Sequence, residues 1–223
     1  MEDDDVISVK CVLLGESAVG KSSLINRFIN DTFKKDSLPT LVGCYSTKEK
    51  YYEKYKQKIK FEIWDTAGEE KYRAINKIFY QDAYVTLLVY DITQKDTYEA
   101  LKDYWYNEVK EYSPNNVIIV VIGNKSDLYE HEQVDENEVK EFCKSINVLY
   151  KQTSAQTGEG VNELFETIGL KILESDEVKN SYKEKNKTKS VKIKTDWENN
   201  FLNVSNITSG NTTKTTKNKK KCC

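Results

Sequence analysis

Near the start of the chain stands Val6-Ile-Ser-Val-Lys-Cys-Val-Leu-Leu-Gly15-Glu-Ser-Ala-Val-Gly20-Lys21-Ser22. Residues 6–14 alternate apolar and polar side chains before an apolar run, which predicts a β-strand. Residues 22–30 place Leu24 and Phe28 four positions apart, which predicts a helix with one apolar face. A glycine-containing turn is therefore predicted to join a strand to a helix.

This turn matches the pattern G-x-x-x-x-G-K-[ST] in the strand–helix context that the pattern requires. Glycines allow the backbone to wrap a phosphate closely, and the helix N-terminus adds its positive dipole end. Lys21 can reach the β- and γ-phosphates of a nucleotide, and the Ser22 hydroxyl can hold Mg²⁺. The whole loop is predicted to bind phosphates: Gly15, Glu16, Ser17, Ala18, Val19, Gly20, Lys21, Ser22 and Ser23.

Further strands and helices alternate along the chain. The expected strands are residues 44–52 and 58–64 as an antiparallel pair, then 83–90, 116–122 and 148–151. The expected helices are residues 97–112, 135–146 and 161–173. The runs at 83–90 and 116–122 are almost wholly apolar, as in strands buried on both faces of a parallel sheet. We expect an α/β fold with a six-stranded, mostly parallel sheet and helices on both faces, which binds ligands beyond the carboxyl ends of its strands.

Two loops at those strand ends carry polar residues suited to a nucleotide. Asp65-Thr-Ala-Gly68 directly follows a strand, so Asp65 is predicted to hold Mg²⁺ through water and the Gly68 N–H to meet the γ-phosphate. Asn124-Lys125-Ser126-Asp127 follows the strand at 116–122. The Asp127 carboxylate can accept hydrogen bonds from N1–H and the amino group of guanine, which adenine does not offer at that edge.

A last loop, Ser154-Ala155-Gln156, completes the expected base site. The Ala155 N–H is predicted to donate to the guanine carbonyl oxygen. Asn124 is expected to tie loops together and face the base, and the stem of Lys125 to cover the ring. The motifs therefore predict a guanine-nucleotide site.

Composition divides the chain unevenly. The net charge of the 223 residues is −2, yet residues 181–223 hold eleven Lys against three acidic residues, so the tail carries +8 and residues 1–180 carry −10. We expect an acidic extension at 1–6, a nucleotide-binding domain at 7–175 and a disordered basic tail at 176–223. The acidic domain argues against nucleic acid as a partner. The single histidine and unpaired cysteine spacing argue against a structural zinc site or a disulfide framework.

With these motifs in place, residues 7–175 resemble a Ras-superfamily small GTPase, a P-loop NTPase fold. Ile63-Trp64 before Asp65-Thr-Ala-Gly68, with Tyr90-Asp-Ile-Thr93, is similar to the Rab family in particular. The stretch 61–68 and Ser113-Pro-Asn115 lean towards its early-endosomal branch. The resemblance implies a switch that binds GTP and GDP with Mg²⁺, hydrolyses GTP slowly and recruits effectors in vesicular traffic.

The resemblance also implies roles for single residues. Phe33 falls where the family stacks an aromatic ring on guanine, and Thr40 falls on the switch threonine that senses Mg²⁺ and the γ-phosphate. Ser22, Thr40 and Asp65 are thus the implied metal ligands. The implied effector surface is Tyr45, Trp64 and Phe79. Residues 34–45 and about 67–80 would be the two switch regions.

One departure affects the catalytic set, which the resemblance places at Lys21, Thr40 and Glu69. The family usually has Gln at position 69, where it orients the attacking water, and a Glu there can either act as a base or repel the nucleotide. A non-hydrolysing scaffold that stays bound to GTP is therefore an alternative function. A metabolic kinase is a third, against which residues 124–127 argue. Gln156 also replaces the usual Lys of the last loop.

The tail ends in Lys219-Lys-Lys221-Cys222-Cys223, which resembles the double-cysteine ending that Rab proteins carry for geranylgeranylation. Two lipids, or one lipid and a basic patch, hold a protein at a membrane. The implied location is the cytoplasmic face of a vesicle or endosomal membrane, with a cytosolic pool. The implied protein partners are an exchange factor, a GTPase-activating protein, a GDP-dissociation inhibitor and effectors.

Overall fold

A computed structural model of the chain describes residues 6–35, 40, 43–66 and 79–175. Several predicted features lie outside these residues, namely Gly68, Glu69, half of the first switch region, most of the second and the tail with Cys222 and Cys223. The division into an acidic extension, a domain and a tail therefore stays a prediction.

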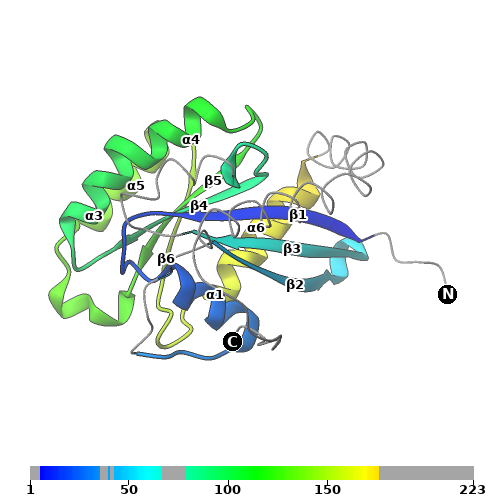
Figure 1. The fold of residues 1–223 in the computed structure, drawn as a ribbon, viewed down its shortest axis with the longest axis horizontal. Coiled ribbons are helices and arrows are strands. Elements are labelled where there is room, and N and C mark those ends of the chain that lie inside the picture. Colours follow the sequence, from blue (N-terminus) through cyan, green and yellow to red (C-terminus); the bar gives the residue numbers. More distant parts are fainter. Residues whose placement is uncertain (1–5, 36–39, 41–42, 67–78, 176–223) are drawn as a thin grey trace, which may run out of the picture. The chain divides into compact units, whose positions relative to one another are not determined.

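The described residues form a six-stranded sheet in the order β2-β3-β1-β4-β5-β6 (Figure 1). β2 pairs with β3 antiparallel, and the other neighbours are parallel. The predicted fold class is confirmed. The strands are β1 (Ile7–Leu14), β2 (Cys44–Tyr52), β3 (Gln57–Asp65), β4 (Val85–Asp91), β5 (Ile118–Asn124) and β6 (Leu149–Thr153).

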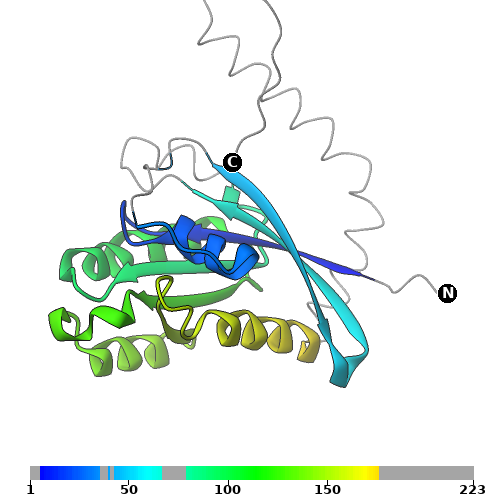
Figure 2. The same cartoon turned by 90° about the horizontal axis from the view of Figure 1, so that it is seen from below.

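One face of the sheet is covered by α1 (Lys21–Asn30) and α6 (Val161–Glu174). Phe28 of α1 stacks on Phe165 of α6 with ring centroids 3.5 Å apart, and Phe61 of β3 meets both rings edge-on. Burying such a ring contributes about 1.5–3 kcal/mol. Figure 2 shows the β2–β3 turn beside the end of α6, where the Tyr55 hydroxyl donates to Glu174 at 3.2 Å. These contacts fix α1, and with it the loop before α1.

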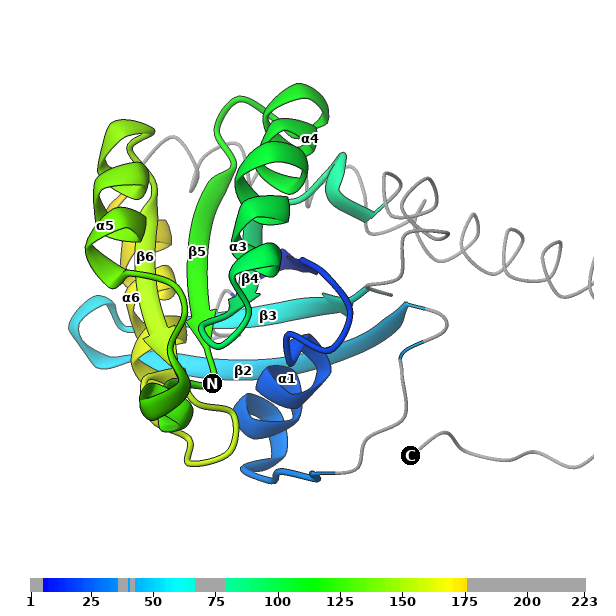
Figure 3. The same ribbon diagram turned by 90° about the vertical axis from the view of Figure 1, so that its left-hand side faces the viewer.

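The other face is covered by the helical segment 95–112 and by α5 (Glu136–Ser145). Tyr98, Leu101, Trp105 and Val109 are buried there with residues of β1, β4 and β5. α5 and α6 lie on opposite sides of β6 (Figure 3). α5 begins after Asp135, whose side chain accepts from the Asn137 N–H at 2.8 Å as an N-cap.

Residues 95–112 differ from the single regular helix predicted for 97–112. The segment runs as α3 (Lys95–Ala100), a π-helical stretch (Leu101–Trp105) and α4 (Tyr106–Tyr112). A π-turn holds an extra residue, so the inner face shifts while apolar residues still occupy it. Periodicity alone does not show this insertion. None of the helices in the described ranges is long and apolar enough to cross a membrane.

The parallel strands β1, β3, β4, β5 and β6 end at one edge of the sheet. In register, Leu13 lies beside Asp65, Asp91 beside Asn124, and Asn124 beside Thr153. This pairing brings the predicted loops together although they are spread over about 140 residues of sequence.

Candidate functional site

A cavity of about 430 Å³ lies at this edge, within the size range of small-molecule sites. Most of the predicted nucleotide contacts line it: Ser17, Ala18, Gly20, Lys21, Ser22, Ser23, Phe33, Thr40, Asn124, Lys125, Asp127, Ala155 and Gln156. The predicted residues Gly15, Glu16, Val19, Asp65 and Ser154 are not among its lining residues. Four lining residues were not among the predicted nucleotide contacts, although the first two fall in the predicted first switch region: Lys34, Lys35, Thr66 and Leu128.

The glycine-containing loop wraps one end of the cavity. Gly15 has φ +143° and Gly20 has φ +97°, and a Cβ on Gly15 would lie 2.1 Å from the carbonyl oxygen of Val89. Both glycines are therefore needed for this backbone path. With the backbone in this conformation, Lys21 Nζ donates hydrogen bonds to the carbonyl oxygens of Gly15 and Glu16, both at 2.7 Å.

Lys21 is buried, with 5% of its surface exposed. Burial lowers the pKa of its ammonium to about 8, against the opposing charges of Asp65 and Glu16. The group is therefore still mostly protonated at pH 7. A fixed, desolvated cation beside N–H groups of a helix start is a suitable partner for phosphate oxygens.

A further contact fixes the same loop from the opposite sheet face. The indole N–H of Trp105 donates to Glu16 Oε1 at 2.9 Å. Trp105 ends the π-helical stretch and is 1% exposed. This contact was not predicted from the sequence, because nothing in the local pattern shows where the indole N–H of Trp105 points.

Three oxygen-bearing side chains meet beside Lys21. Ser22 Oγ donates to Asp65 Oδ2 at 2.5 Å and lies 2.8 Å from Thr40 Oγ1, and Thr40 Oγ1 lies 3.4 Å from Asp65 Oδ2. The other carboxylate oxygen, Asp65 Oδ1, is buried and has no hydrogen-bond partner among the described residues. Burial raises the pKa of the Asp65 carboxyl, against the lowering effects of Ser22, Lys21 and Thr40.

This cluster fits the Mg²⁺ ion that the sequence predicts. Hydroxyl and carboxylate oxygens are ligands that a hard divalent cation prefers. A cation would also compensate the buried charge of Asp65 and its unpartnered oxygen. The three predicted ligands therefore lie together, two of them (Ser22 and Thr40) on the cavity wall.

The opposite end of the cavity is built from side chains of separate loops. Asn124 Nδ2 donates to the Val19 carbonyl at 2.8 Å, so Asn124 does tie two loops together. Asn124 Oδ1 accepts from the Thr153 hydroxyl at 3.2 Å and from the Ala155 N–H at 3.3 Å. In this structure the Ala155 N–H, predicted to meet guanine, therefore points to Asn124.

Asp127 and Lys125 flank this end. Ser154 Oγ donates to Asp127 Oδ1 at 2.5 Å, which orients the carboxylate at the cavity wall. Lys125 has φ +69°, and its ammonium pairs with Asp91 at 2.6 Å. The pair holds the lysine stem in place along the cavity.

Three aromatic residues that do not line the cavity form a cluster of their own. The ring centroids of Tyr45 and Trp64 are 4.9 Å apart, and those of Trp64 and Phe79 are 5.5 Å apart. Tyr45 is 47% exposed. The structure thus brings together the three residues predicted as a partner surface.

Sequence reasoning also missed Arg27 of α1, whose guanidinium donates to the carbonyl oxygens of Ala155 and Gln156 in the last loop. One signal was present: of the 34 Lys and Arg residues only two, at 27 and 73, are Arg. Arg is the better residue where a planar fork must meet two acceptors.

Comparison with known proteins adds independent information. The model of the Ras family matches residues 10–174. Human (Homo sapiens) "Ras-related protein Rab-22A" is 37% identical over 168 residues, which cover 75% of this chain and 85% of that protein. The "GTP-binding protein YPT53" of Saccharomyces cerevisiae is 37% identical over 172 residues, covering 74% and 77%. Mouse (Mus musculus) "Ras-related protein Rab-17" is 40% identical over 165 residues, covering 74% and 76%.

Proposed function

Since this chain belongs to the Ras family and, within it, to the Rab small GTPases, we propose that it is a GTP- and GDP-dependent switch in membrane traffic that hydrolyses GTP and recruits effectors. One observation carries the proposal: a phosphate loop, an oxygen cluster for a cation and two guanine-type loops share a single cavity.

The proposed reaction is in-line attack of water on the γ-phosphate, which breaks the bond between the γ-phosphorus and the β–γ bridging oxygen. Lys21 is held by two carbonyls at 2.7 Å, so its charge is fixed where negative charge develops on the β- and γ-oxygens. Ser22, Thr40 and Asp65, whose oxygens meet beside Lys21, would hold Mg²⁺, and a divalent cation there would supply further neutralisation of the phosphate charge. GDP and phosphate are the products.

Selection of guanine is assigned to the opposite end of the cavity. Asp127, oriented by Ser154, accepts hydrogen bonds from N1–H and the amino group, and the Ala155 N–H turns from Asn124 to the base carbonyl. Phe33 and the Lys125 stem cover the two ring faces. A carboxylate left unpaired opposite adenine is costly, which supports discrimination of roughly 10⁴-fold.

Membrane attachment is proposed on sequence grounds. Cys222 and Cys223 would carry geranylgeranyl groups, and the lysine-rich tail would add attraction to an anionic leaflet. The proposed location is the cytoplasmic face of a vesicle or endosomal membrane, with a cytosolic pool held by a GDP-dissociation inhibitor. The Cys222→Ser/Cys223→Ser double variant should then be recovered from the cytosolic fraction, and continued membrane association would contradict this attachment.

Hydrolysis is tested by single-turnover phosphate release from protein loaded with GTP. We expect slow release by the wild-type protein, and a changed rate in Glu69→Gln because residue 69 is assigned to the attacking water. Absence of release from the wild-type protein, with release restored in Glu69→Gln, would instead establish the GTP-bound scaffold. The proposed function also requires that the protein bind GDP more tightly than ADP.

A further inference from the structure

We propose that Arg27 is a positioning residue for guanine selection: it holds the backbone of the last loop so that the Ala155 N–H meets the base carbonyl. The inference rests on the proposed function, because it assigns a role within the same nucleotide site. Arg27 itself is not among the residues that line the cavity.

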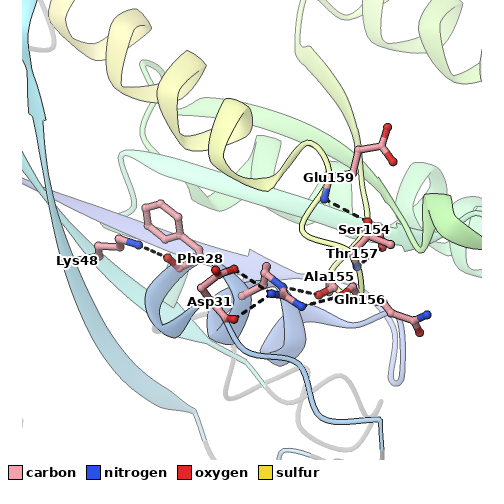
Figure 4. A network of polar contacts seen from close by, with 9 residues as sticks. Phe28, Asp31, Lys48, Ser154, Ala155, Gln156, Thr157 and Glu159 are labelled. Atoms are coloured by element: carbon pink, nitrogen blue, oxygen red, sulfur yellow. Dashed lines mark hydrogen bonds and ion pairs between the residues drawn. The ribbon is translucent and has the colours of Figure 1, made fainter.

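The guanidinium of Arg27 bonds two successive carbonyl groups of the loop. Nε donates to the Ala155 oxygen at 2.9 Å, and one terminal nitrogen donates to the Gln156 oxygen at 2.7 Å. In Figure 4 dashed lines run to Ala155 and Gln156 from the α1 side of the site. Two parallel contacts from one planar group fix orientation as well as distance, which a single ammonium does not.

The same guanidinium is anchored at its other end to its own helix. Its second terminal nitrogen donates to the Asp31 carbonyl and to Asp31 Oδ1, both at 2.9 Å. The Arg27 side chain is 15% exposed, whereas that of Asp31 is 89% exposed. Of the loop contacts, the Nε bond to Ala155 is partly buried and the bond to Gln156 is exposed. The bond to Ala155 is therefore the stronger of the two, since water weakens an exposed hydrogen bond.

The last loop is closed by hydrogen bonds between its own backbone groups. Ser154 N–H donates to the Glu159 carbonyl at 2.9 Å, and Gly158 N–H donates to the Ser154 carbonyl at 2.8 Å. A Cβ on Gly158, which has φ +89°, would lie 3.4 Å from Arg27 Cδ. Because the loop is braced internally, fixing two of its carbonyls fixes the direction of the neighbouring N–H groups.

Ala155 is therefore held from both sides. Its carbonyl accepts from Arg27 at 2.9 Å, and its N–H donates to Asn124 Oδ1 at 3.3 Å. The second bond is at the long, weak end of the N–H···O range, whereas the first is at its centre. The strong contact therefore sets the position of Ala155, and the weak one is available for exchange with a carbonyl oxygen of the ligand.

The test compares GDP with 6-thio-GDP, in which a sulfur atom replaces the base carbonyl oxygen. The sulfur is a weaker acceptor, while N1–H and the amino group that Asp127 reads are kept. Dissociation rates are measured from full-length protein loaded with either nucleotide and Mg²⁺. The variants are Arg27→Ala, Arg27→Lys and, as the matched control, Asp31→Ala, which removes the anchor's exposed carboxylate but leaves both loop contacts.

Arg27→Ala should speed GDP release about tenfold and 6-thio-GDP release less than about threefold. Arg27→Lys should lie between Arg27→Ala and the wild type, because an ammonium reaches one carbonyl, and it keeps the test available if Arg27→Ala does not fold. Asp31→Ala should change neither rate by more than about twofold.

Equal acceleration for the two nucleotides would show a merely structural role and overturn the inference, as would an unchanged GDP rate in both Arg27 variants. The inference would also be overturned if Asp31→Ala accelerated GDP release as much as Arg27→Ala does. The contacts at the end of α1, and not those with the loop, would then control GDP release. If any of these results is found and the wild-type protein still binds GDP more tightly than ADP, only the inference about Arg27 is refuted. A wild-type protein without that preference refutes the proposed function instead.

Discussion

The two ends of the cavity are built in different ways. The phosphate end is one contiguous stretch, residues 15–23, whose backbone conformation follows from two glycines and a helix start. The base end draws on separate segments, which side-chain contacts of Asn124, Asp127 and Arg27 hold together. The end of the cavity that is formed by local backbone can be predicted from a sequence motif. The end that is formed by hydrogen bonds between loops depends on the tertiary structure.

The largest effect is expected at the phosphate end. Lys21→Ala removes the buried ammonium at the loop, so affinity for GDP should fall by roughly 10³-fold or more. Titration calorimetry measures the loss. Lys140→Ala is the matched control, since Lys140 is 52% exposed and pairs with Glu136 on α5. If Lys21→Ala and Lys140→Ala bind GDP with comparable affinity, Lys21 contributes no more to phosphate binding than an exposed surface charge does.

The next effect is expected at the base end. Asp127→Asn exchanges a charged acceptor for a neutral amide, so GDP affinity should fall by about 10²-fold while ADP affinity stays unchanged. The ratio of the two affinities, measured by competition against labelled GDP, is the readout. A parallel fall for both nucleotides would mean that Asp127 supports the loop and does not read the base.

A smaller effect separates the two ends directly. Trp105→Phe keeps the buried ring but removes the N–H that Glu16 accepts, so unfolding free energy should drop by about 1–3 kcal/mol. Because Glu16 belongs to the phosphate loop, release of GDP and of 6-thio-GDP should accelerate equally. Denaturant unfolding and the two release rates are the measurements, and selective acceleration of GDP release would place Trp105 at the base end instead.

The smallest effect is expected at position 156 of the last loop, where Gln replaces the Lys that is usual in the family. Arg27 bonds the carbonyl of residue 156, which is independent of the side chain there. Gln156→Lys should therefore change GDP affinity by less than about threefold, a change within reach of exposed ion pairs. A tenfold change by titration calorimetry would show that the side chain, and not the braced backbone, controls this end.

The sequence predicted much of this architecture because its signals are local. The strand at β1, the pair β2–β3, the buried runs of β4 and β5 and the phosphate loop all follow from apolar patterns and glycine positions. The grouping of Ser22, Thr40 and Asp65 followed from motif order together with the family resemblance.

The rest depends on where side chains point. The π-helical stretch keeps apolar residues on its inner face, so the periodicity of residues 97–112 did not distinguish it from a regular helix. The Trp105–Glu16 bond joins residues 89 positions apart, and the Arg27–Ala155 bond joins residues 128 positions apart. Neither pairing leaves a mark on the local hydrophobic pattern, and the scarcity of Arg, the one sequence signal for position 27, was not used.

The most direct measurement is titration calorimetry of the full-length wild-type protein with GDP and with ADP in the presence of Mg²⁺. The two nucleotides share their phosphates and sugar, so they engage the phosphate end equally and differ only at the base end. The account predicts that GDP binds at least about 10³-fold more tightly than ADP. Equal affinities would contradict it, because Asp127 and Ala155 would then have no role in choosing the base.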